Sequence, residues 1–164
     1  MITPLSVEQA RQLLRSCHFA RLACVINGDP YVIPINYKFE NDFINCHSLP
    51  GKKIEGLRKH PRACVQVDEI KSDLCWKSVL AFGNYEEVVD PTERDQILGS
   101  LLREFPMLTP VESAVAEDVN APEIIVFRIR VERITGVSEE KPGNLSRIRC
   151  FATAVNRDED LKFA

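Results

Sequence analysis

The sequence predicts a mainly β protein of the α+β class, built as a six-stranded antiparallel barrel, closed or nearly closed, with flanking helices. Six short segments carry strand-like alternation or apolar runs, and segments of helical periodicity lie between them. The connections between the first three strands are too short for parallel crossovers, which disfavours a doubly wound parallel sheet. A length of 164 residues suits one domain.

The chain is expected to begin with a helix and a hairpin. Ser6 and Gln9 form a capping-box pattern, and an apolar helical stripe continues to about Ser16. A strand is predicted over residues 20–26, and Asn27-Gly28 after it is a strong signal for a tight hairpin turn.

The return strand of this hairpin alternates along residues 31–39, where Tyr31, Ile33 and Ile35 share a face with Tyr37. Pro34 removes one donor from the strand ladder, so we expect an edge strand or a bulge there. A second tight turn leads into a third strand over residues 43–48. The alternating aromatic residues Tyr31 and Tyr37 are expected to serve packing rather than ligand contact.

The second half of the chain is also predicted to consist of short strands and helices. Asp90 and Pro91 are typical of a helix N-terminus, and Gly83 predicts a bulge or sharp bend in its strand. The predicted elements are a short helix ended by Pro61, a strand over 63–68, a polar connection over 69–74, strands over 76–85 and 123–134, and a helix from 91 to about 105.

Two segments carry weak patterns. Residues 109–122 are expected to hold a helical turn or two. The barrel domain is expected to span residues 1–140, followed by a C-terminal tail or arm over 141–164 that packs on a partner subunit or is mobile.

Composition excludes several classes of function. A net charge of −3 provides no global basic field for nucleic acid or an anionic membrane, and no stretch is apolar enough to span a bilayer. The N-terminus lacks a signal-peptide pattern, so the cytoplasm is the expected location. The six cysteines form no Cys-x-x-Cys pair, which favours buried reduced thiols and no metal site.

One loop has the chemistry of an anion site. The strand ending at His47 and Ser48 is followed by Leu49-Pro50-Gly51, and then Lys52 and Lys53 begin a helical pattern. A hydroxyl, backbone N–H groups, positive charge and a helix N-terminus therefore converge at one place. A solvated basic turn would show the same residues, so this motif alone leaves both interpretations open.

The order of these pieces resembles the pyridoxamine 5′-phosphate oxidase-like FMN-binding split barrels, and among them the nitroimidazole reductase-like branch. The matching pieces span roughly residues 5–135 and are Ala20-Arg21-Leu22-Ala23, Pro30 through Tyr37, Ile44 through Ser48, Gly51 through Glu55, His60-Pro61, Trp76 through Val79, and Gly83.

The resemblance implies a split β-barrel that forms a homodimer with FMN at the subunit interface. It implies a phosphate site at Ser48, Lys53 and Lys52, with Pro34, Ile35, Asn36 and Tyr37 along the isoalloxazine ring largely through backbone groups. His47 would lie beside the flavin, and Trp76 and Ser78 would approach it from the next strand pair.

The function that follows is a flavin-dependent oxidoreductase acting on a small nitroaromatic or quinone-like molecule, with NAD(P)H or a reductase as electron donor. No catalytic residue is assigned, and His47 is the single candidate. Two alternatives stay open: a flavin-binding or redox-sensing dimer without turnover, and a split barrel for another cofactor such as haem or a deazaflavin.

Overall fold

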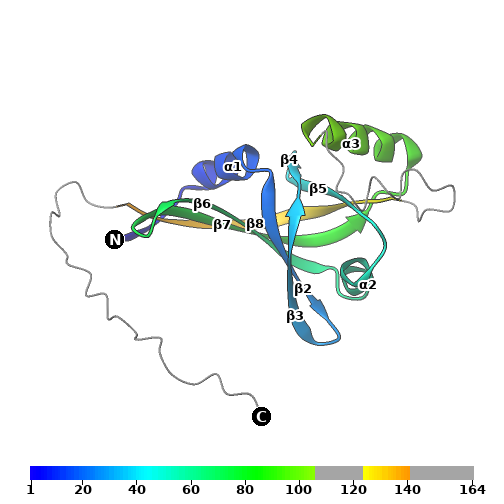
Figure 1. The fold of residues 1–164 in the computed structure, drawn as a ribbon, viewed down its shortest axis with the longest axis horizontal. Coiled ribbons are helices and arrows are strands. Elements are labelled where there is room, and N and C mark those ends of the chain that lie inside the picture. The colour runs from blue at the N-terminus through cyan, green and yellow to red at the C-terminus, as the bar shows by residue number, and fades with distance from the viewer. Residues whose placement is uncertain (106–123, 141–164) are drawn as a thin grey trace, which may run out of the picture.

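The computed structural model describes residues 1–105 and 124–140, which form one eight-stranded antiparallel sheet with three helices (Figure 1). The strand order is β3-β2-β6-β7-β8-β5-β4, and β1 pairs with β8 off this path. The elements are β1 (Ile2–Pro4), α1 (Val7–Ser16), β2 (Phe19–Ile26), β3 (Asp29–Asn36), β4 (Lys38–Glu40), β5 (Phe43–Ser48), α2 (Lys52–Lys59), β6 (Arg62–Ser72), β7 (Cys75–Glu87), α3 (Pro91–Glu104) and β8 (Ile125–Glu139).

The barrel closes through one continuous stretch of chain that changes its partner. β3 pairs with β2, with Asn36 opposite Phe19, whereas β4 pairs with β5, with Lys38 opposite Asn45. Only Tyr37 separates β3 from β4. The two ends of the strand order are thus joined covalently, and the sheet wraps into a barrel that is split where β3 and β5 diverge.

Tyr37 fixes the point at which the partner changes. Its side chain is fully buried, and its hydroxyl donates a hydrogen bond of 2.8 Å to the carbonyl of Leu14 in α1. Its backbone N–H donates to the carbonyl of His18 at 3.1 Å. The barrel interior around it is filled by apolar side chains that include Leu22, Ile44 and Phe127. Burial on this scale locks the chain in place at the crossing.

The local signals at the helix ends are confirmed. Ser6 and Gln9 form the reciprocal capping box of α1. The Asp90 side chain accepts a hydrogen bond from the N–H of Glu93 at the start of α3. A register shift between Phe82 and Gly83 confirms the predicted bulge.

None of the helices among the described residues is long and apolar enough to cross a membrane.

The fold class is confirmed, but the strand count differs from six. β1 was not predicted, and the expected strand over 31–39 is divided into β3 and β4. The predicted polar connection over 69–74 is wrong, because β6 and β7 continue as a paired hairpin through that region. Glu69 lies opposite Lys77 and forms an ion pair with it at 3.9 Å, so polar residues support the ladder there. The expected helical turns in 109–122 and the expected arm over 141–164 lie outside the described residues.

The bulge at Gly83 generates a testable prediction. A Cβ atom at this position would lie 2.1 Å from the carbonyl oxygen of Arg130, which is backbone and cannot move aside. Gly83→Ala should therefore lower the free energy of unfolding by at least about 2 kcal/mol in urea titrations.

Gly99→Ala is the matched control, because a Cβ there meets nothing closer than 3.7 Å on the exterior of α3. It should raise stability by about 0.5–1 kcal/mol. Equal effects of the two substitutions would contradict the close approach of β7 to β8 at Gly83.

Candidate functional site

A hollow of about 520 Å³ lies where the barrel is split, between β3 on one side and the end of β5 and the start of α2 on the other. The lining residues are Tyr31, Ile33, Pro34, Ile35, Asn36, His47, Ser48, Leu49, Pro50, Gly51, Lys52 and Lys53. The described lining residues therefore come from two segments of the chain, one from each side of the split.

The wall from β3 offers backbone groups. Within the described part of the chain, β3 pairs only with β2, and its other edge faces the hollow. An edge strand presents a row of N–H and C=O groups that pair with whatever lies against it. This wall can consequently recognise a flat ligand that carries alternating donors and acceptors at its rim.

The opposite wall has the features of an anion site. Gly51 is the N-cap of α2 and provides no side chain to cap the first-turn N–H groups, which have no acceptor within a helix. Lys52 and Lys53 follow in the first turn, and none of the described residues that line this hollow is acidic. Ser48 is 4% exposed, and its hydroxyl donates to the carbonyl of Leu49 at 2.7 Å. Positive charge and the helix dipole therefore add at one end of the hollow.

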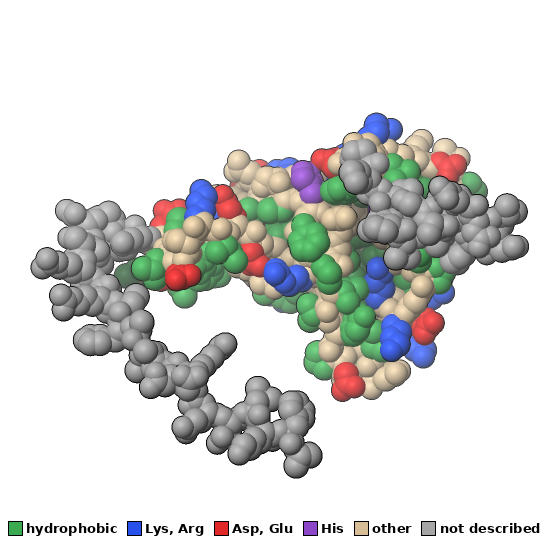
Figure 2. Space-filling model, in the orientation of Figure 1, with side chains coloured by type: hydrophobic (Ala, Val, Ile, Leu, Met, Phe, Trp, Pro, Cys, Tyr) green, Lys and Arg blue, Asp and Glu red, His purple; other side chains and the backbone are tan. Residues whose placement is uncertain are grey.

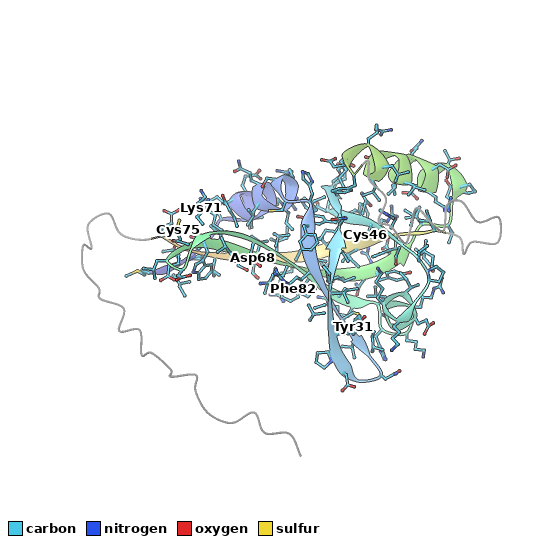
Figure 3. All side chains as sticks on the ribbon, viewed as in Figure 1. Tyr31, Cys46, Asp68, Lys71, Cys75 and Phe82 are labelled. Atoms are coloured by element: carbon cyan, nitrogen blue, oxygen red, sulfur yellow. The ribbon has the colours of Figure 1, made fainter. Side chains whose placement is uncertain are left out.

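A buried thiol lies behind this wall. Cys46 precedes His47 on β5, where Figure 3 labels it, and its side chain is fully buried. Burial raises the pKa of the Cys46 thiol to about 12, although the nearby positive charge of Lys53 acts in the opposite direction. The thiol therefore stays protonated and unreactive at neutral pH.

The hollow brings together seven of the ten side chains expected at a cofactor site: Pro34, Ile35, Asn36, His47, Ser48, Lys52 and Lys53. Tyr37 is adjacent in sequence but its side chain belongs to the core. Trp76 and Ser78 lie on β7 and do not line the hollow. The Trp76 indole N–H donates to the Glu139 carboxylate at 3.2 Å, and the Ser78 hydroxyl accepts from the side-chain amide of Gln66 at 3.3 Å.

Several lining residues were not predicted to belong to the site, and Tyr31 is one of them. It packs against the core as expected, and it also lines the hollow from β3, where Figure 3 labels it. The signal was present in the alternation, because Tyr31 and Ile33 continue the inward face of β3 beyond the point where β5 can cover it. Among the described residues, no cluster of three or more His, Cys, Asp or Glu side chains is placed to hold a metal ion.

Comparison with known proteins gives a consistent result. The family model described as pyridoxamine 5′-phosphate oxidase matches residues 6–138. The structure of a FAD-binding protein from Mesorhizobium loti is 30% identical, covers 85% of this chain and 99% of its own, and superposes with a TM-score of 0.70.

Two further relatives extend the comparison. A candidate 5-nitroimidazole antibiotic resistance protein from Bacteroides thetaiotaomicron shares the fold at 20% identity, with a TM-score of 0.65 over 84% of this chain and 87% of its own. An uncharacterised protein from Rhizobium meliloti is 36% identical over 84 residues, which are 51% of this chain and 56% of that protein. The chain thus matches little more than half the length of that relative.

Proposed function

The chain belongs to the pyridoxamine 5′-phosphate oxidase family, and on this premise we propose that it is a flavoprotein that holds an FMN unit in the hollow at the barrel split. The FAD-binding relative from Mesorhizobium loti supports a flavin nucleotide. The FMN unit is common to FMN and FAD, and it is the part for which this hollow provides complementary groups.

The observation that supports this proposal is that one hollow has an open backbone edge, from β3, on one side and a basic helix N-terminus, from α2, on the other. The isoalloxazine ring is flat and has carbonyl and N–H groups along its pyrimidine edge, which match the open backbone edge of β3. The phosphate carries nearly two negative charges and matches Lys52, Lys53 and the N-terminus of α2. A volume of about 520 Å³ lies within the range of roughly 300–1,000 Å³ for small-molecule and cofactor sites.

The proposed reaction class is an oxidoreductase that reduces a small organic molecule such as a nitroaromatic or a quinone. When bound, the flavin supplies hydride or electron transfer at its N5 position. The residues of this chain bind and orient it: β3 fixes the ring plane, and Ser48 and Lys53 anchor the phosphate end. His47 is the one lining imidazole, so it is the candidate to hold or move a proton there.

The proposal includes a homodimer, because one face of the sheet exposes apolar side chains that no helix of residues 1–105 and 124–140 covers. α1 packs on the interior face, whereas the outer face of the β2–β3 hairpin exposes Phe19, Val25 and Val32 at 59%, 39% and 58%. Phe82, labelled in Figure 3, lies on the same outer face, opposite Cys64 of β6. A second copy of the chain would cover this apolar face and would bring its Trp76 and Ser78 toward the flavin.

The phosphate anchor gives a direct test. The double substitution Ser48→Ala with Lys53→Ala should weaken FMN binding at least tenfold, roughly 1.4 kcal/mol, in a fluorescence titration of the flavin-free protein. Lys71→Ala is the control, because Lys71 lies on the β6–β7 hairpin (Figure 3), where it pairs with Glu69 at 3.2 Å. FMN affinity unchanged by the double substitution would remove this site assignment.

The dimer has its own test. Light scattering should give twice the mass of one chain for the wild type. Val32→Glu should give monomers, because it places a charge in the apolar face without disturbing the core. Lys71→Glu serves as a control that adds the same charge elsewhere and should leave the dimer intact. A dimer that tolerates Val32→Glu would show that this face is not the interface.

A further inference from the structure

The outer face of the sheet carries exposed apolar side chains at the end where β6, β7, β8 and β1 lie side by side. Ile70 of β6 is 72% exposed, Ile2 of β1 is 58% exposed and Val137 of β8 is 39% exposed. Trp76 of β7 lies between them, directly opposite Ile70. Hydrophobic side chains are visible at this end of the molecule, at the left of Figure 2. We call Ile2, Ile70, Trp76 and Val137 the end patch.

The strand register places these four residues on one face. Glu139 is the Cα partner of both Trp76 and Ile2, and directly opposite residues share a face of a sheet. Val137 lies two residues before Glu139 and therefore points the same way. Trp76 also shares its face with Phe82, six residues further along β7. The end patch is thus part of the outer face.

The opposite face at this end is covered by the chain around α1. A Cβ atom at Gly136 would lie 3.0 Å from side-chain atoms of both Leu5 and Val79. Gly136 precedes Val137, and successive strand residues point to opposite faces. None of the described helices therefore shields the end patch from water. An exposed apolar surface of this kind is typical of a docking site.

The chain leaves the sheet beside the end patch. β8 ends at Glu139, and residues 141–164 lie outside the described residues. The first of them are Lys141-Pro142-Gly143-Asn144, and Pro-Gly is a strong turn signal. Four residues span at most about 14 Å, so the segment that follows starts within reach of the end patch.

The sequence of this segment fits an apolar surface. At about 100° per residue, five apolar side chains of residues 145–155 fall within an arc of about 120° on a helix. They are Leu145, Ile148, Phe151, Ala152 and Val155. Ser146 and Thr153 fall on the other side. A helix of this length is about 16 Å long, and four strands about 4.8 Å apart span about 14 Å.

Charge supports the same match. Residues 141–155 contain Lys141, Arg147 and Arg149 and no acidic residue. On the outer face, the charged residues among 2–4, 68–70, 76–78 and 137–139 are Asp68 and Glu139, which are both acidic. A basic amphipathic segment is therefore complementary to this end of the sheet in charge as well as in hydrophobicity.

We propose that residues 145–155 form an amphipathic helix that packs on the end patch of the same chain. The helix would bury Ile2, Ile70 and Val137 against its apolar side. In the dimer of the proposed function, Trp76 would then lie between this helix and the flavin of the partner copy. The packing itself does not depend on a bound flavin.

Hydrogen exchange of the full chain, followed by mass spectrometry, tests this packing. Backbone amides of residues 145–155 should exchange at least about tenfold more slowly than those of a free peptide of the same sequence. Ile70→Asn on the sheet, or Ile148→Asn on the segment, should bring the exchange to within about threefold of the peptide. Thermal melts verify that each variant is folded.

Two controls carry the same new side chain. Lys71→Asn changes the neighbour of Ile70, which pairs with Glu69 at 3.2 Å, and Thr153→Asn changes the other side of the segment. Both should keep the slow exchange.

The outcomes decide between the possible occupants of the end patch. Exchange as fast as in the free peptide in the wild type would overturn the proposal. Slow exchange that survives Ile70→Asn would also overturn it, because the segment would then pack elsewhere. Slow exchange that is lost in monomers, obtained by dilution or by Val32→Glu, would assign the end patch to the partner copy's segment and overturn packing within one chain. Slow exchange retained in the monomer and lost in Ile70→Asn is the result that supports it.

Discussion

The structure depends on one strand that cannot pair with both of its neighbours along its whole length. Residues 29–40 run beside β2 as β3 and beside β5 as β4, and the change occurs at Tyr37. The buried Tyr37 ring and its bond to Leu14 fix the crossing against α1. Beyond the crossing, β3 keeps an open edge whose backbone groups require partners. The hollow is the consequence of this constraint, and the open edge becomes one of its walls.

The two ends of the hollow differ in charge. The loop after β5 is short, so α2 begins at the rim of the hollow and points the N–H groups of its first turn toward it. Lys52 and Lys53 add fixed positive charge at that end, while the β3 wall contributes no charged side chain to the hollow. A ligand with an anionic tail and a flat polar ring is oriented by this asymmetry alone. Gly56 brings α2 close to β2, because a Cβ atom there would lie 2.7 Å from Cγ1 of Ile26.

Local signals in the sequence predicted much of this arrangement. The capping box at Ser6, the Asp90 cap and the bulge at Gly83 each depend on a few neighbouring residues, and the anion loop is contiguous. The division of β3 from β4 could not be predicted in this way, because the alternation continues unbroken through Tyr37 and the change of partner is a long-range event. The pairing of Glu69 with Lys77 could not be predicted either, because it depends on how β6 and β7 pair and not on the pattern of either segment alone. Trp76 and Ser78 lie away from the hollow of their own chain, so their expected role requires a partner subunit and stays a prediction.

The most direct test of the flavin assignment is the visible absorbance spectrum of the freshly purified protein, with the released cofactor identified by mass spectrometry. The assignment predicts flavin bands, about one flavin per chain, and bleaching of these bands under anaerobic conditions by NAD(P)H or a partner reductase. A colourless protein that also fails to bind added FMN or FAD would contradict it. A sharp Soret band from haem would contradict it equally.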